Sequence, residues 1–196
     1  MTRPEFPRHL STVFAVIGST PLRNAIGAVI FGYDALRINA WPLIVLDWSL
    51  GCFDQVSTWA ADLSRDVTRL TVVCGALSPT DTIFVEPDGI GSSLAAALYD
   101  AGHDAVDEVP EQFAALTLQE RAIASSAYVA RGLVISSRPA YEKQSTFQDV
   151  TRNHLIDQIA SMSVTDKDPE CAELFSAWSL GVLLALDTSP RSKAAK

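Results

Sequence analysis

The sequence is poor in cysteine and has no excess of positive charge, and both features restrict what the chain can be. Its three cysteines, Cys52, Cys74 and Cys171, lie far apart in apolar neighbourhoods and form no metal-spaced pair, so we expect buried free thiols rather than zinc ligands or disulfides. A net charge of −8 argues against broad electrostatic binding to DNA or to acidic membranes. A local basic groove stays open, because the distribution of charge matters more than its total.

Long hydrophobic runs are also missing. No stretch approaches the roughly 18 apolar residues that a membrane-spanning helix needs. The N-terminal "MTRPEFPRHLSTVFAVIGST" lacks the layout of a signal peptide, because its apolar run is short and interrupted. We therefore expect a cytoplasmic protein without a membrane partner. The length of 196 residues predicts one domain over residues 11–187, with a flexible lead-in (1–10) and a disordered polar tail (188–196).

Several catalytic and nucleotide-binding motifs are absent. There is no phosphate-cradling G-x-x-x-x-G-K-[ST] loop, which excludes a P-loop ATPase motor, and no G-x-S-x-G nucleophile elbow of a serine hydrolase. The three histidines, His9, His103 and His154, have no histidine or cysteine at ligand spacing. We expect structural or surface roles for them.

The pattern of apolar residues predicts a sheet that begins as a meander. Three β-rich runs, over residues 11–20, 25–34 and 35–49, are separated by short connections that favour antiparallel pairing. An amphipathic helix follows within residues 53–73, with Asp54 placed to cap or charge its start. The later predicted elements are a strand at 82–86, a helix at 92–101 closed by Gly102, a strand at 104–109, a helix at 116–131, a strand at 133–136, a loop at 136–145, and helices at 150–162 and 171–186.

This element order is that of an α/β fold with a mixed sheet. An antiparallel three-strand meander followed by parallel strands and crossover helices is the order of the ribonuclease H-like fold, whereas a doubly wound sheet would more often begin with a βαβ unit.

The motifs resemble one family in particular. The run "FVEPDGIGSSLAAALYDAGHDAVDEVP" resembles the middle of the nuclease domain of phage large terminases, the DNA-packaging motor proteins: a strand ends in an acidic residue, and a glycine turn and a helix follow. "ERAIASSAYVARGLVIS" is similar to a later helix and strand of that domain, "FAVIGST…AIGAVIFGYD" to its first hairpin, and "ELFSAWSLGVLLAL" to its closing helix.

The resemblance implies a two-metal nuclease, in which three carboxylates from separate elements hold two Mg²⁺ or Mn²⁺ ions. Glu86 matches the acidic residue at the central strand end and is the implied metal ligand. The other two positions hold Ser19 and Ser176, so two ligands are missing. Asp47 and Asp88 are the better candidates to replace them. The remaining acidic candidates are Asp34, Asp168 and Glu173.

Two other binding features have ordinary alternatives. Gly89 and Gly91 open a helix and could hold a phosphate at its N-terminus, or they could only form a tight turn. The third quarter of the chain is rich in basic residues that would suit a nucleic-acid backbone or simply a mixed surface: Arg121, Arg131, Arg138, Lys143 and Arg152. Glu86 itself could be a solvated strand-end carboxylate or a helix cap.

Three functions follow from these observations. The first is a terminase-type nuclease domain that acts on or binds double-stranded phage DNA, with metal-dependent phosphodiester hydrolysis if its ligand set is complete. The second is a catalytically degenerate domain that binds phage packaging or assembly proteins and needs no cofactor. The third is a phosphate- or nucleotide-binding α/β domain.

Overall fold

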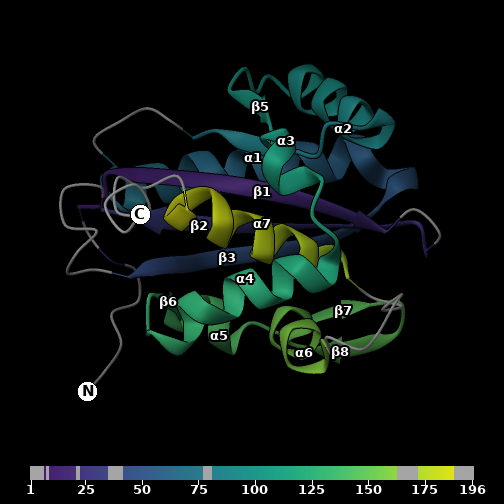
Figure 1. Cartoon of the computed structure of the whole chain (residues 1–196). Coiled ribbons are helices and arrows are strands. Elements are labelled where there is room, and N and C mark those ends of the chain that lie inside the picture. Colours follow the sequence, from purple (N-terminus) through teal and green to yellow (C-terminus); the bar gives the residue numbers. More distant parts are fainter. Residues whose placement is uncertain are drawn as a thin grey trace.

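The computed structural model describes residues 7, 9–20, 23–34, 42–76, 81–162 and 172–187 and contains a six-stranded mixed sheet. Its strand order is β5-β4-β1-β2-β3-β6 (Figure 1). The strands are β1 (Thr12–Thr20), β2 (Ala25–Tyr33), β3 (Leu43–Cys52), β4 (Ile83–Val85), β5 (Val106–Glu108) and β6 (Val134–Ser136). The pairs β1–β2 and β2–β3 are antiparallel, and β4, β5 and β6 join by parallel pairing, so the predicted meander and mixed sheet are confirmed.

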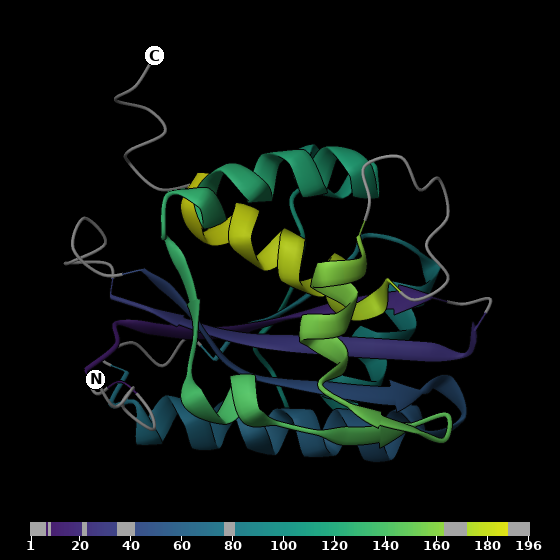
Figure 2. The same cartoon turned by 90° about the horizontal axis from the view of Figure 1, so that it is seen from below.

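Helices cover both faces of the sheet (Figures 1 and 2). On one face, α1 (Val56–Val73) and α2 (Gly89–Asp100) pack against the inner strands. On the other face lies α7 (Glu173–Asp187), with α4 (Leu118–Ala130) packed against it. The smaller elements are the 3₁₀ turn Phe53–Gln55, α3 (Glu111–Ala114), α5 (Arg138–Glu142), α6 (His154–Ser161) and a hairpin of β7 (Ser145–Phe147) and β8 (Val150–Arg152).

The core has two halves, one on each face of the sheet. β1 and β2 are buried almost throughout, and their alternating residues supply both halves. Val16 and Phe31 face α7, whereas Ile17 and Ile30 face α1. This alternation decides which side chains of β1 can reach a site on the α7 face.

The structure departs from the prediction mainly over residues 136–154. The predicted loop at 136–145 contains α5, which begins with the Ser137 side chain accepting a hydrogen bond from Ala140 N. The predicted helix at 150–162 begins only at His154, because residues 150–152 pair as β8 with β7. Three-residue strands have too few residues to show a period, so the hairpin left no periodic signal.

Several boundaries also moved. The third strand runs over Leu43–Cys52, and residues 35–41 of the predicted run lie outside the described residues. α2 begins at Gly89, three residues earlier than predicted. Asp54 makes no cap hydrogen bond to α1 and instead accepts one from Asn24 Nδ2.

Both ends of the predicted domain can be placed only in part. Leu10, assigned to the flexible lead-in, is buried, and its backbone N–H donates to Cys74 O. The tail at 188–196 lies outside the described residues. Within the described part of the chain, no helix combines the length and apolar character needed to cross a membrane.

Candidate functional site

Glu86 follows directly after β4, at the end of the sheet where β1 also ends. Its side chain is 27% exposed, and its carboxylate points towards α7 and α4. The Ser176 hydroxyl, in the first turn of α7, donates a 2.9 Å hydrogen bond to Glu86 Oε1. The structure therefore brings Glu86 and the predicted final-helix position Ser176 together.

Arg121 completes this centre from α4. Its Nη1 donates to Ser176 Oγ at 2.9 Å and to Glu86 Oε1 at 3.3 Å. Its Nη2 donates to Ala114 O at 2.8 Å and makes a weaker hydrogen bond to Glu86 Oε2 at 3.5 Å. The side chain is 5% exposed, and Nε has no hydrogen-bond partner. A guanidinium buried in this way has no surface for a DNA backbone, so the predicted DNA-binding role of Arg121 is wrong.

The sequence held a weak signal for this inward arginine. Arg121 and Ser125 are four residues apart and therefore share one face of α4. Both are buried, and the Ser125 hydroxyl donates back to Arg121 O. A small polar residue one turn after an arginine marks a face that can pack closely against a neighbouring helix. The ion pair between Arg121 and Glu86 joins residues that are distant in the sequence, so it is visible only in the tertiary structure.

On β1, the residue beside Glu86 is Gly18 and not Ser19. β1 and β4 pair in register at Ala15–Ile83, and continuing that register sets Gly18 next to Glu86. Ser19 pairs with Ile26, a member of the core half under α1, so strand alternation turns it to the other face. The β1 residue on the same face as the Glu86 centre is therefore Gly18, and the assignment of the vacated position to Ser19 stays a prediction that this register does not favour.

Gly18 also lets α7 lie directly on β1. A Cβ at this position would collide with the Glu173 carbonyl oxygen and would come within 2.9 Å of the Ser176 Cβ. Any side chain at 18, an aspartate included, would have to displace the first turn of α7. The space in which a first-strand carboxylate would stand is filled by helix backbone.

Asp47, the first proposed substitute, lies far from Glu86. Three strand steps separate β3 from β4, which at about 4.8 Å each amounts to about 14 Å. Asp47 is paired with Ile30 and so faces α1. There its carboxylate accepts from Lys143 Nζ at 2.7 Å and lies 4.0 Å from Arg69. The prediction that Asp47 shares a metal site with Glu86 is wrong.

Asp88, the second proposed substitute, is the N-cap of α2. Its side chain accepts a 2.6 Å hydrogen bond from Gly91 N, so it neutralises a helix-end donor. A Cβ on Gly91 would collide with the Glu86 carbonyl oxygen, whereas one on Gly89 would meet nothing within 4 Å. The tight-turn interpretation accounts for Gly91. Phosphate binding by Gly89 and Gly91 stays a prediction, and the Asp88 carboxylate, which accepts from Gly91 N, counts against it because it would repel an anion.

The three remaining acidic candidates do not complete a carboxylate cluster. Asp34 follows β2 at the opposite end of the sheet, and Asp168 lies outside the described residues. Glu173 is buried beside the centre, but its two oxygens accept hydrogen bonds from Thr20 Oγ1 at 3.0 Å and Gln158 Nε2 at 2.9 Å. Sequence reasoning missed Gln158, whose Oε1 also accepts from the first backbone N–H groups of α7.

A divalent metal pair does not fit this donor set. Among the described residues, no three His, Cys, Asp or Glu side chains converge in a way that could hold a metal ion. The one carboxylate at the centre is already neutralised by a guanidinium. Repulsion between that guanidinium and a divalent ion 4 Å away is about 8 kcal/mol at an effective dielectric constant of 20, twice the value for two unit charges.

The described cysteines and histidines add no reactive group here. Burial raises the pKa of the Cys74 thiol to about 11, and burial followed by the nearby Asp54 raises that of Cys52, so both thiols are neutral at physiological pH. His103 is hydrogen-bonded to Ser64 Oγ and Asp81 O, and His154 to the carbonyls of β7 and β8. These are structural contacts, as predicted for the two histidines.

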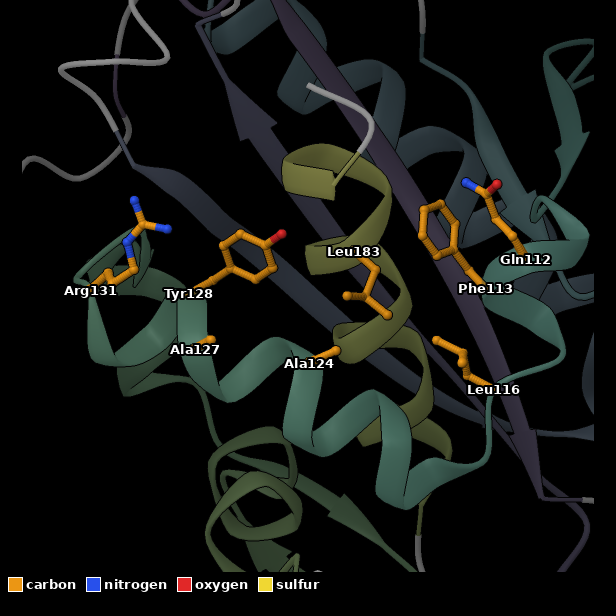
Figure 3. Close-up of a pocket in the computed structure, with 8 residues that line it drawn as sticks. All are labelled: Gln112, Phe113, Leu116, Ala124, Ala127, Tyr128, Arg131 and Leu183. Carbon is orange, nitrogen blue, oxygen red and sulfur yellow. The ribbon is translucent and has the colours of Figure 1, made fainter. Parts of the chain in front are cut away.

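A groove of about 540 Å³ lies between α3, α4 and α7 (Figure 3). Phe113, Leu116 and Leu183 supply its apolar wall, and Tyr128 and Arg131 stand at its α4 side. None of its lining residues is a carboxylate or a histidine.

The comparisons with known proteins give a fold. No protein-family model and no curated protein sequence matches the chain. Among solved structures, the manganese-soaked human cytomegalovirus terminase nuclease domain matches with a TM-score of 0.61 at 13% sequence identity, over 92% of this chain and 86% of that one. The same domain without the soak matches with a TM-score of 0.60 at 11% sequence identity, over 91% of this chain and 85% of that one. With manganese and a bound inhibitor, the TM-score is 0.60 at 12% identity, over 92% and 85% of the two chains. The chain therefore has the ribonuclease H-like fold of terminase nuclease domains, as the resemblance predicted.

Proposed function

We propose that this chain is a nuclease-fold domain of a DNA-packaging apparatus that does not hydrolyse DNA and instead binds other proteins of that apparatus. The observation that carries the proposal is the closed centre. α7 lies directly on Gly18, and Arg121 and Ser176 bind Glu86, so that among the described residues no carboxylate cluster forms where hydrolysis would need one. Two-metal hydrolysis needs several acidic ligands around exposed ions, and this arrangement supplies one.

The distribution of basic side chains supports the same proposal. Four of the five basic residues in the third quarter bind acids instead of forming an open groove: Arg121 binds Glu86, Arg138 binds Glu142, Lys143 binds Asp47 and Arg152 binds Asp157. Each pairing removes a cation that could otherwise replace counterions on a DNA backbone. We therefore expect weak binding to double-stranded DNA.

Apolar surface on α4 favours a protein partner. Ile123 and Val129 on α4 are 57% and 45% exposed. The groove that α4 helps to line adds further apolar wall. Exposed large apolar side chains and apolar grooves are typical of protein contact surfaces.

The first test is cleavage of supercoiled plasmid with Mn²⁺, with and without EDTA, for the wild type and Glu86→Ala. We expect no nicking above the background of the variant, because one neutralised carboxylate cannot hold two ions. Nicking that needs metal and disappears in Glu86→Ala would overturn the proposal in favour of a metal-dependent terminase nuclease with an unusual ligand set.

A photo-crosslinking side chain at position 123 tests the partner. In cells that produce the chain from its own locus, we expect crosslinked adducts whose size on a denaturing gel does not change after nuclease treatment. A crosslinker at exposed Asp62 on α1, on the other face of the sheet, is the matched control. Adducts at 123 that nuclease removes would show that the surface contacts nucleic acid instead.

A further inference from the structure

Arg121 joins three separate elements at the centre of the fold. Its guanidinium is bonded to Glu86 after β4, to the last residue of α3 through Ala114 O, and to Ser176 in α7. In this fold a metal centre would connect the same strand end to the closing helix, according to the resemblance of the sequence to terminase nucleases. Here an internal cation makes that connection.

All the partners of the guanidinium are oxygen atoms. Two come from the Glu86 carboxylate, one from the Ser176 hydroxyl and one from the Ala114 carbonyl. A guanidinium has only N–H donors, so each of these oxygens acts as an acceptor towards it. The Arg121 side chain therefore supplies the positive charge at the Glu86 carboxylate from within the protein.

Charge balance explains why the site needs a cation. Glu86 is mostly buried, and Arg121 is its only ion-pair partner among the described residues. A mostly buried carboxylate that loses its partner is left without compensation, which is far more destabilising than the loss of a surface pair. Glu86 also lies against α2, because its carbonyl oxygen limits the space at Gly91.

We infer that the Arg121 guanidinium takes the structural place of a divalent cation, so that the packing of β4, α3, α4 and α7 depends on this side chain and not on metal. The inference rests on the proposed function in one respect, namely that the centre holds no catalytic metal. The new part is that the centre binds a guanidinium-type cation, and that the stability of the fold therefore does not depend on Mg²⁺ or Mn²⁺.

The test follows thermal unfolding of four proteins in EDTA, in Mn²⁺ and in millimolar ethylguanidinium: the wild type, Arg121→Ala, Arg121→Lys and Arg138→Ala. We expect the wild-type Tm to be the same in EDTA and Mn²⁺. Arg121→Ala should lose about 5–10 °C, since a partly buried carboxylate loses its partner. Ethylguanidinium should restore part of that loss, and ethylammonium, which lacks the planar fork, should restore less.

Two variants keep the inference falsifiable. Arg138→Ala removes an exposed pair with Glu142 on α5 and should leave Tm within about 1 °C of the wild type. If Arg121→Ala does not fold, Arg121→Lys keeps the charge without the bidentate geometry and should show an intermediate Tm. A wild-type Tm that falls in EDTA and rises with Mn²⁺, or an Arg121→Ala Tm equal to the wild type, would overturn the inference.

The outcome can be separated from that of the plasmid assay. If the wild type nicks DNA in a metal-dependent way but its Tm is the same with and without metal, the proposed function is refuted and the structural role of Arg121 is not. A wild type that does not nick but needs metal for stability would refute the role of Arg121 alone.

Discussion

At the scale of single residues, the same type of side chain serves different purposes in this protein according to what it touches. Glu86, Asp47 and Asp88 were all candidates for one metal site, and each carboxylate is bonded to a different partner: a guanidinium, an ammonium and a backbone N–H. Asp88 is a helix cap. If capping is its role, its substitution should change the stability of the protein in the absence of any metal.

Asp88→Ala should lower the free energy of unfolding by about 1 kcal/mol, because Gly91 N loses its acceptor at the start of α2. Asp88→Asn should be close to the wild type, since asparagine caps as well as aspartate. Urea unfolding at neutral pH measures both. Equal losses in the two variants would mean that the charge of Asp88, and not its hydrogen bond, is what the fold uses.

At the scale of elements, the contact of α7 with β1 and β2 organises the site. The first turn of α7 supplies Ser176, and Gln158 from α6 accepts hydrogen bonds from Leu174 N and Phe175 N. The close approach requires the absence of a side chain at Gly18. That one glycine therefore controls both the seating of the helix and the space at the centre.

Gly18→Ala should destabilise the protein by about 1–3 kcal/mol, the usual cost of inserting a methyl group into a packed core. The added Cβ would push against the backbone of α7, which cannot rotate away. Gly89→Ala is the matched control, because nothing lies within 4 Å of its Cβ and alanine favours a helix more than glycine does. It should be neutral or slightly stabilising in the same denaturation experiment. A tolerated Gly18→Ala would mean that α7 does not sit on β1 as described.

The sequence predicts elements with a clear period and misses those without one. The meander, α1, α2 and α4 follow from alternation, from helical spacing and from Gly102 and Gly132, which end two of these helices at positive φ. Glu86 and Ser176 follow from the resemblance. The role of Arg121 does not, because an arginine on a helix is ordinarily solvated and only the packing of α4 against α7 turns this one inward.

At the scale of the whole molecule, the cohesion of the fold is concentrated in the middle of the sheet. β1 and β2 have neighbouring strands on both sides and helices on both faces, and their residues supply both halves of the core. β5 has three residues, is largely exposed, and among the described strands pairs with β4 alone. The β7–β8 hairpin belongs to a separate two-stranded sheet.

Native-state hydrogen exchange should therefore divide the chain into two classes. Amides of β1 and β2 should exchange only through global unfolding, with a steep dependence on urea, because opening them exposes both core halves. Amides of β5, β7 and β8 should exchange orders of magnitude faster and with little urea dependence, through local opening. Peptide-resolved mass spectrometry measures both classes in one experiment. If the β7–β8 amides exchanged as slowly as those of β1, the hairpin would belong to the cooperative core, and the division of the sheet described here would be wrong.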